Sequence, residues 1–446
     1  MPAERLYYAD SSLTRFTATV TDIRERSRNG GSSVWQVALD RSAFYPTSGG
    51  QPHDIGTLAA TAPSGARLEA PVLDVEEDEH GELWHLTPKP LLAGTQVEGA
   101  IDAARRLDHM QQHSGQHLLS ALFYREYSAL TVSFHLGDQV STIDLNTESI
   151  ISDQLADIER LANAIVAEAR PVTLRTVSAD DADLLLQSGA LRKIPNRSGN
   201  IRIVVISGEG AGPGTQAIYG EGAPNPDLDV NACGGTHVTS TSQIGAVLLR
   251  GTERVRQLTR VSFLCGNRAI AAARADDTLL TQLSRDFSAG RTDLLAAVAR
   301  LKADARTGGK ERQALRKDLA NYHAARLIVE DPPRNDLRIV RRIFPDRDAD
   351  YVKLLASRVA AAAPHTVALF ASTQQPGPQH EAAIVVACSP DLGQNAGELL
   401  RTALSSFKGR GGGSPTLAQG LVLADQLAAV LDALEAKLRP GSSPVS

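Results

Sequence analysis

Residues 107–123 read LDHMQQHSGQHLLSALF and residues 231–237 read NACGGTH, and these two stretches organise the rest of the chain. In the first, apolar residues recur at helical spacing, which predicts an amphipathic helix. His113 and His117 stand four residues apart on it. On a helix this spacing puts both imidazoles on one face, with Cβ atoms about 6 Å apart, so that both rings can reach one metal ion.

The second stretch offers a thiol, Cys233, and a further imidazole, His237, on either side of glycines that allow a tight turn. Each motif alone has an ordinary explanation, since a helical His often bonds a neighbour and Gly-Gly often marks a turn. Together they predict a His₃Cys set, which suits tetrahedral zinc. His109 extends the histidine stripe. Either H-x-x-x-H pair could therefore supply the ligands, with the spare ring orienting one of them.

The composition is that of a globular protein with several domains. The chain has 446 residues, 42% of them apolar, and a mean hydropathy of −0.17. We find no charged start followed by an apolar run and no apolar stretch of about twenty residues, so we expect no secretory signal and no membrane span. Three cysteines cannot form a disulfide framework, which favours a cytoplasmic location. A net charge of −5 argues against indiscriminate coating of nucleic acid.

Residues 1–100 alternate apolar and polar positions between turn residues, so we expect a β-barrel domain. Within it, residues 43–58 read AFYPTSGGQPHDIGTL. This segment is either a structural hairpin turn or a loop that approaches a ligand through Gly49, Gly50 and Gln51.

Residues 101–265 form the second expected domain, an α+β unit whose metal ligands come from a helix and a loop. Strands are expected within 133–146, a long helix over 151–171 and a single strand over 243–266.

Residues 266–330 read as helices that are interrupted at Gly290 and at Gly308-Gly309. Leucines recur on one face. A helical linker of this kind either pairs two chains as a dimerisation arm or packs on the next domain.

Residues 331–446 look like a separate α/β domain that ends in an unusual segment, SSFKGRGGGSPTLAQG at 405–420. Lys408 and Arg410 interrupt a glycine cluster there. We expect a shaped loop whose backbone amides and two cations meet a phosphate; the alternative is a flexible connection.

With these motifs in view, the whole chain resembles the long form of the AlaX group of alanyl-tRNA editing proteins. The resemblance is carried, in this order, by FYPTSGGQPHDIG, HMQQHSGQHLLS, NACGGTHV and GRGGGSPTLAQG. It implies an α+β multidomain chain with four parts. These are a translation-factor-like β-barrel, a zinc-binding editing domain shared with threonyl-tRNA synthetase, a helical linker and an RNA-binding domain of the DHH-associated type.

The resemblance also assigns residues. It places the zinc ligands on His113, His117, Cys233 and His237 and leaves His109 outside the set. A polar residue of the strand after the histidine helix should help to recognise a serine hydroxyl; Ser133 and His135 are the candidates, Thr131 less so. The segment that would touch tRNA comprises Lys408, Arg410, Gly411, Gly412 and Gly413.

The implied reaction is hydrolysis of the ester in Ser-tRNA(Ala), with Gly-tRNA(Ala) as a second substrate. An alanine pocket rejects serine by only about 10²-fold and cannot exclude glycine, so errors need a second sieve. Correct Ala-tRNA escapes because a site that bonds the serine hydroxyl loses about 1–3 kcal/mol when that hydroxyl is missing. Since the chain starts directly with the expected barrel, we expect no aminoacylation activity.

The catalytic groups are less marked in the sequence. Four protein ligands suggest a closed structural zinc, whereas a hydrolytic zinc usually keeps one open position. Gln116 could position water or substrate, and the amides of Gly234 and Gly235 could bind an oxyanion. Two rival interpretations remain open: a non-catalytic tRNA-binding protein with a structural zinc, and a metal-dependent hydrolase of small esters.

Overall fold

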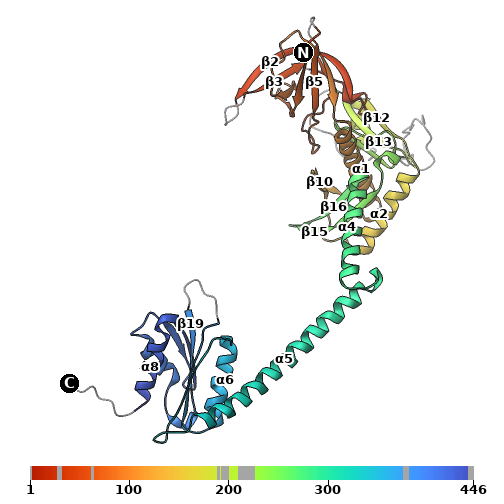
Figure 1. Cartoon of the computed structure of the whole chain (residues 1–446). Helices are drawn as coiled ribbons and strands as arrows, with labels where there is room; N and C mark the ends of the chain where they lie inside the picture. Colours follow the sequence, from red (N-terminus) through yellow and green to blue (C-terminus); the bar gives the residue numbers. More distant parts are fainter. Residues whose placement is uncertain are drawn as a thin grey trace. The chain divides into compact units, whose positions relative to one another are not determined.

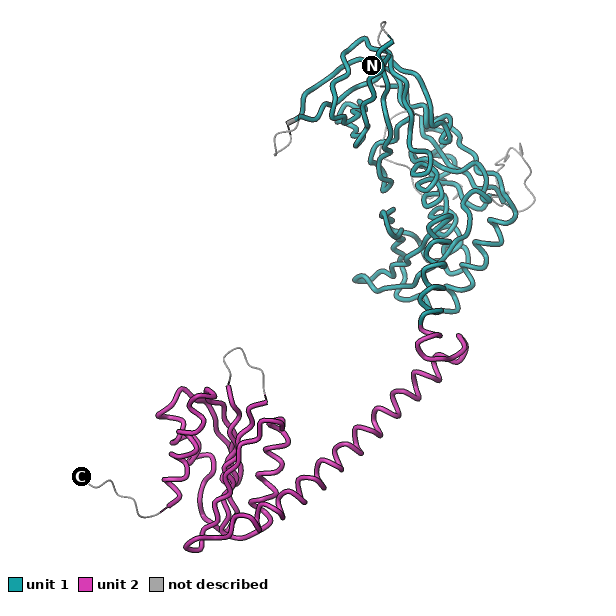
Figure 2. The backbone as a smooth tube through the Cα atoms, in the orientation of Figure 1, with its two compact units in different colours: residues 1–282 teal, residues 283–446 magenta. Residues whose placement is uncertain are grey.

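The structure is a computed structural model that describes residues 3–27, 33–61, 65–187, 191, 200–208, 227–374 and 381–439. The chain forms two compact units, residues 1–282 and 283–446, which are coloured separately in Figure 2 and are described one at a time. Among the described residues, no helix combines the length and the apolar character that a membrane span requires.

A seven-stranded antiparallel sheet, in the order β6-β5-β9-β2-β3-β8-β7, begins the first unit (Figure 1). Its alternating apolar residues build a core of their own, and the long β2 pairs with β9 in its first half and with β3 in its second. No ladder joins β6 to β7 among the described residues, so closure into a barrel stays a prediction. The strands are β2 (Arg15–Ser27), β3 (Ser33–Leu39), β5 (Gly56–Thr61), β6 (Arg67–Val72), β7 (Asp74–Glu77), β8 (Leu83–Thr87) and β9 (Gln96–Ile101), with a short parallel pair of β1 (Glu4–Arg5) and β4 (Arg41–Ser42) beside them.

The predicted histidine helix is confirmed as α1 (Ala103–Tyr127). Asp102 caps it by accepting from the amides of Ala104 and Arg105, which satisfies donors that a helix start leaves free. The helix is buried over most of its length and packs in one core with α2 (Ser152–Ala167) and with the antiparallel sheet β10-β11-β16-β15. These strands are β10 (Thr131–Leu136), β11 (Ser141–Leu145), β15 (Val247–Val255) and β16 (Leu258–Cys265).

The single strand expected over 243–266 is wrong, because β15 and β16 form a hairpin. Arg256 takes a left-handed conformation at the turn, with φ of 57°. That conformation costs a non-glycine residue a small amount of free energy. The sequence contains no typical turn residue at this position, so the hairpin was not expected.

A second, three-stranded sheet completes the first unit, in the order β12-β13-β14. It consists of β12 (Val172–Val177), β13 (Ile201–Ile206) and β14 (Asp229–Ala232), and α3 (Ala179–Gln187) packs with it in a small apolar core. Strand β14 leads directly into the Cys-His loop. The register of this sheet therefore decides where the thiol of the loop lies.

The helical region contains α4 (Gly266–Asp286) and α5 (Leu294–Glu330). The break near Gly290 is confirmed, but the predicted interruption at Gly308-Gly309 is wrong, because α5 continues through both glycines. Each glycine costs about 1 kcal/mol relative to alanine in a helix. Good helix formers on both sides offset that cost, since propagation of an existing helix is favourable.

The second unit is a three-layer α/β/α arrangement around the mixed sheet β17-β18-β19-β21-β20 (Figure 1). Both faces of β18 are buried: alternate residues join a core with α7 and α8, and the residues between them join a core with α5 and α6. The elements are β17 (Arg338–Phe344), α6 (Ala349–Ala362), β18 (Thr366–Ser372), β19 (Glu381–Cys388), α7 (Ala396–Leu404), β20 (Arg410–Gly413), β21 (Leu417–Leu423) and α8 (Leu427–Leu438).

The glycine cluster lies in a strand, so the expected loop is wrong. Arg410–Gly413 form the edge strand β20, paired with β21. Glycine is needed because a Cβ at Gly413 would lie 2.3 Å from the carbonyl oxygen of Leu417, and one at Gly411 would lie 2.7 Å from that of Gln419. The glycines suggested a loop whose backbone approaches a phosphate. In the structure they instead allow the backbones of β20 and β21 to approach closely and pair.

Candidate metal centre

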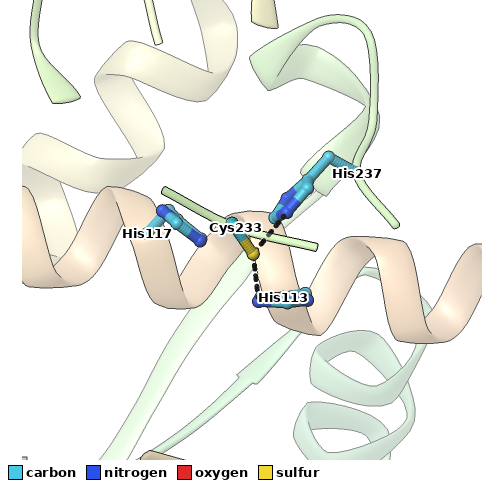
Figure 3. A group of neighbouring side chains, drawn as sticks. All are labelled: His113, His117, Cys233 and His237. Atoms are coloured by element: carbon cyan, nitrogen blue, oxygen red, sulfur yellow. Dashed lines mark hydrogen bonds between the residues drawn. The ribbon is translucent and has the colours of Figure 1, made fainter. Parts of the chain in front are cut away.

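Two elements bring together four side chains that could hold a metal ion. His113 and His117 project from one face of α1, and the loop after β14 supplies Cys233 and His237 (Figure 3). One candidate ligand atom from each of the four side chains lies within 4.8 Å of every other. The structure thus gathers the complete set that the two sequence motifs predicted.

The cluster is compact and mostly buried, with Cys233 partly exposed. The Cys233 sulfur lies 3.4 Å from Nε2 of His113 and 3.3 Å from Nε2 of His237. All three histidines are buried. Zinc bonds of about 2.0 Å to nitrogen and 2.3 Å to sulfur, at a tetrahedral angle, would separate the two ligand atoms by about 3.5 Å. The donor set and its spacing therefore fit zinc.

The opposite nitrogen of each imidazole ring has a partner of its own. Nδ1 of His117 lies 3.0 Å from a carboxylate oxygen of Asp229, and Nδ1 of His237 lies 3.2 Å from the hydroxyl of Ser114. Nδ1 of His113 lies 2.8 Å from the side-chain oxygen of Gln51. Partners in these positions orient imidazoles that bind metal through Nε2, which is a second sign that the cluster fits a metal.

The environment of the cluster shifts its protonation equilibria. Burial opposes ionisation of Cys233, yet the charges of His113 and His237 and hydrogen bonds from the imidazoles hold its pKa well below the usual range. Burial lowers the pKa of His237 to about 3. Burial also opposes the charge of His117, but Asp229 and Cys233 outweigh it and raise its pKa to about 9. The thiol is thus easily available as a thiolate, the form that binds metal.

Gln116 lies on α1 between His113 and His117 in sequence and carries an unused acceptor. It is buried, one helical turn from His113, and its Nε2 donates to the hydroxyl of Ser120 at 2.8 Å. That hydroxyl lies 2.7 Å from the hydroxyl of Thr131 on β10. Oε1 of Gln116 has no hydrogen-bond partner among the described residues. A buried oxygen without a donor costs free energy, which marks this atom as a place where a ligand or a water would bond.

The glycine motifs lie against the cluster. The amide of Gly235 donates to the Cys233 sulfur at 3.4 Å, so it already has an acceptor, and Gly234 beside it remains as an oxyanion candidate. Gly50 packs on the ring of Phe134, whose centroid lies 5.6 Å from that of His113. Gly49 has positive φ, and a Cβ there would meet nothing within 4 Å. The loop around Gln51 therefore forms one wall of the metal centre.

The strand candidates Ser133 and His135 lie apart from the cluster. Ser133 donates to Asp144 at 2.7 Å, and Asp144 also binds Arg260. His135 is exposed. Phe134, between them in sequence, is the residue of this strand that faces His113. Strand alternation turns its two neighbours to the opposite face.

His109 is the histidine that the cluster leaves out. Its ring is buried, and neither nitrogen has a hydrogen-bond partner among the described residues. Burial lowers its pKa to about 4. The His113–His117 pair is thus the one that meets the Cys-His loop.

The predicted tRNA-binding residues belong to the second unit. Lys408 and Arg410 are exposed, and Arg410 pairs with Glu381 at 3.1 Å. Together with Asp350 and Gln419, Arg410 and Gly411 line a surface hollow beside β20.

Asp229, Ser114 and Thr236 were not singled out from the sequence. For Asp229 a signal existed, because residues 229, 231 and 233 alternate along one face of a strand that ends at the thiol. Ser114 and Thr236 carried no such signal, since their roles depend on which segments meet in the folded chain.

Residues 201–262 match the family model described as "Threonyl and Alanyl tRNA synthetase second additional domain". Alanyl-tRNA editing protein Aarsd1 of Bos taurus is 31% identical over 333 residues, which cover 72% of this chain and 68% of that protein. Alanyl-tRNA editing protein AlaX-L of Pyrococcus horikoshii is 27% identical over 442 residues, which cover 94% of each. The alanine--tRNA ligase of Methanoculleus marisnigri is 30% identical over 428 residues, which cover 94% of this chain and 41% of the ligase.

Proposed function

The chain belongs to the family of alanyl-tRNA editing proteins, and from this premise we propose that it hydrolyses mischarged tRNA(Ala) in trans. The resemblance that the four sequence motifs predicted is thereby confirmed. We propose Ser-tRNA(Ala) as the principal substrate and Gly-tRNA(Ala) as the second, without aminoacylation. The observation that carries the proposal is a cluster that could hold a metal ion, together with the buried, unpartnered oxygen of Gln116 on the same helix.

Gln116 would recognise the serine side chain. Its free Oε1 accepts the hydrogen of the serine hydroxyl, while Ser120 and Thr131 hold the amide from the other side. Alanine has no hydroxyl and would leave the oxygen unpaired, at a cost of about 1–3 kcal/mol. Of the three strand candidates, Thr131 is favoured over Ser133 and His135, because its hydroxyl lies 2.7 Å from that of Ser120, which bonds Gln116.

The cofactor proposed is zinc, held by His113, His117, Cys233 and His237. When bound, it supplies positive charge that ties the helix to the loop and polarises an ester carbonyl nearby. The chain itself would supply the rest: Gln116 would orient the substrate, and the amide of Gly234 would bond the carbonyl oxygen as negative charge develops there. Water adds to the ester carbon, the bond to the ribose oxygen breaks, and that oxygen takes up a proton.

The second unit would bind the body of the tRNA. Lys408 and Arg410 are exposed cations, and Gly411, Gly412 and Gly413 belong to a strand that is at the edge of the sheet among the described residues, so alternate amides there have no strand partner. Edge amides beside two cations suit a phosphate.

The remaining assignments are also proposals. We assign a β-barrel domain to residues 1–100, an editing domain to 101–265, a helical linker to 266–330 and a DHH-associated-type domain to 331–446. We propose a cytoplasmic location. A homodimer through the linker is supported by large apolar side chains that α5 leaves exposed, namely Leu295, Leu301, Leu315 and Tyr322.

The test is a deacylation assay with tRNA(Ala) charged with serine, glycine or alanine. We expect the zinc-loaded protein to release serine fastest, glycine more slowly and alanine least. The His117→Ala variant should release none above the spontaneous rate. Equal release by wild type and blank would overturn the enzymatic proposal, and equal kcat/KM on a small serine ester would overturn the role of the tRNA.

One observation favours a second candidate function, a non-catalytic tRNA-binding protein. Four protein ligands can fill the coordination of zinc, which is typical of a structural site. In that case the protein would bind tRNA(Ala) and contain one zinc, yet release no amino acid in the same assay.

A further inference from the structure

Gln51 makes an unusual set of contacts for a residue of a glycine-rich loop. Its side chain is fully buried, with 0% exposure. Oε1 accepts a hydrogen bond from the backbone amide of Thr236 at 3.0 Å and lies 2.8 Å from Nδ1 of His113. Nε2 donates to the hydroxyl of Thr236 at 2.9 Å. One amide group therefore joins the amino-terminal sheet, helix α1 and the Cys-His loop.

These contacts determine which way round the amide lies. A backbone N–H can only donate, so the Gln51 atom that faces the amide of Thr236 must be the oxygen. An amide oxygen can only accept, so Nδ1 of His113 must carry the hydrogen of their shared bond. The other nitrogen, Nε2, then has a free lone pair, and this nitrogen faces the Cys233 sulfur.

We infer that Gln51 is a positioning residue that fixes His113 in the tautomer with Nε2 available for the metal and holds the Cys-His loop against α1. The inference rests on the zinc assignment proposed above, but it does not depend on the deacylase reaction. It also assigns Gln51 a task other than the substrate contact expected from its sequence motif, because both acceptor positions of its oxygen already have protein donors.

The backbone around Gln51 is built for this contact. A Cβ at Gly235 would lie 2.2 Å from a carbon of the His113 ring and 2.9 Å from Oε1 of Gln51. Both distances are far below normal contact, so the loop reaches the ring and the amide only because residue 235 has no side chain. The same glycine that allows the turn thus allows Gln51, His113 and Thr236 to meet.

The test is the zinc affinity of the full-length chain, measured by competition with a chromophoric chelator. Gln51→Met keeps the length of the side chain and removes the acceptor, and we expect zinc to bind about 10- to 100-fold more weakly. Gln51→Glu keeps an acceptor for both donors and should restore affinity to nearly that of the wild type. Gln111→Met is the matched control, because Gln111 is a buried glutamine whose amide bonds Gln243 outside the cluster.

A second readout separates positioning from loss of stability. In the zinc-loaded wild type and in Gln51→Glu, the Nδ1 hydrogen of His113 should give an NMR signal that exchanges slowly with water. In Gln51→Met that signal should exchange rapidly or be lost.

The zinc affinities of the wild type and the variants separate the role of Gln51 from the zinc assignment. If the wild type and Gln51→Met bind zinc equally tightly, the inference is overturned while the zinc assignment stands. If Gln111→Met weakened zinc binding as much as Gln51→Met does, the inference about Gln51 would also be overturned. If the wild type binds no stoichiometric zinc, both the zinc assignment and this inference fall.

Discussion

Asp54 and Arg106 form an ion pair in which each side chain is only 1% exposed. The pair connects the loop that carries Gln51 to the first turns of α1, and Arg106 also donates to the carbonyl oxygens of Ser11 and Ala43. Breaking a buried pair leaves an uncompensated charge, so we expect Asp54→Asn to lower the free energy of unfolding by about 3–5 kcal/mol. Both tryptophans lie in the first sheet, and their fluorescence during urea unfolding reports on this region.

The matched control for that prediction is Glu76→Gln. This variant removes an exposed ion pair with Arg26 in the first sheet. Exposed pairs contribute about 0–1 kcal/mol, so this variant should unfold almost as the wild type does. If both variants lost the same free energy of unfolding, this would contradict the claim that burial makes the Asp54–Arg106 pair important for stability.

Removal of the metal should destabilise the first unit. A chelator should lower its unfolding temperature, and added zinc should restore it, because binding to the folded state alone stabilises that state. Cys233→Ser should bind zinc weakly and lose this response. Cys388→Ala is the control, since Cys388 is a buried thiol of the second unit. A chelator response that survives in Cys233→Ser would show that the metal lies elsewhere.

Gln116→Met should lower kcat/KM for Ser-tRNA(Ala) by about 10- to 100-fold, the effect of one lost bond to a buried acceptor. Gly-tRNA(Ala) has no side-chain hydroxyl and should be hydrolysed nearly as before. Ser120→Ala and Thr131→Val should give smaller losses on the serine substrate, because they only hold the amide of Gln116. Equal losses on both substrates would mean that Gln116 acts on a group common to the two esters.

Replacing Lys408 and Arg410 by glutamine should weaken tRNA binding and reduce its dependence on salt. Each lost phosphate contact should reduce the slope of log K against log salt by about one unit. Arg439→Gln is the control, because Arg439 is an exposed cation of the same unit that directly follows α8 and pairs with Glu435 of that helix. The comparison needs binding measured at several salt concentrations, and an unchanged slope in the double variant would rule out these cations as phosphate ligands.

His85 should make the first sheet sensitive to acid. Its ring is buried between the carbonyl oxygen of Val37 and the hydroxyl of Ser42, and burial lowers its pKa from 6.5 to about 4. The unfolded chain therefore binds the proton first, so the stability from neutral His85 is complete above pH 6.5 and is lost as the pH falls toward 4. The shift corresponds to about 3 kcal/mol.

The measurement is urea unfolding, followed by tryptophan fluorescence, at several pH values between 7 and 4. His85→Gln should be less stable than the wild type at pH 7 but should lose less stability on acidification. A steep loss that is identical in both proteins would assign the acid sensitivity to other groups, such as the buried His109.

Features that depend on a local residue pattern could be predicted from the sequence. The spacing of His113 and His117 and that of Cys233 and His237 could be read directly, because both metal ligation and helix formation follow short repeats. The partners Asp229 and Ser114, and the role of Gln51 against His113, could not be read in this way. They depend on the register of β14 and on contacts between segments up to 185 residues apart.

The errors have local physical reasons. Gly308-Gly309 look like a helix break, but the helix formers around them carry α5 through. The glycines at 411–413 look like a phosphate loop, yet they form an edge strand whose partner leaves no room for a Cβ. In both cases glycine permits two conformations, and neighbouring residues of the helix or of the paired strand select one.

The bond between Gln51 and Thr236 also sets an order of events during synthesis on the ribosome. A nascent chain can fold its first sheet and α1 early, but the side chain of Gln51 and the ring of His113 wait for a loop made 185 residues after Gln51. Until that loop emerges, the histidine pair stands without Cys233, and no amino-terminal fragment that stops before residue 237 contains all four side chains of the cluster.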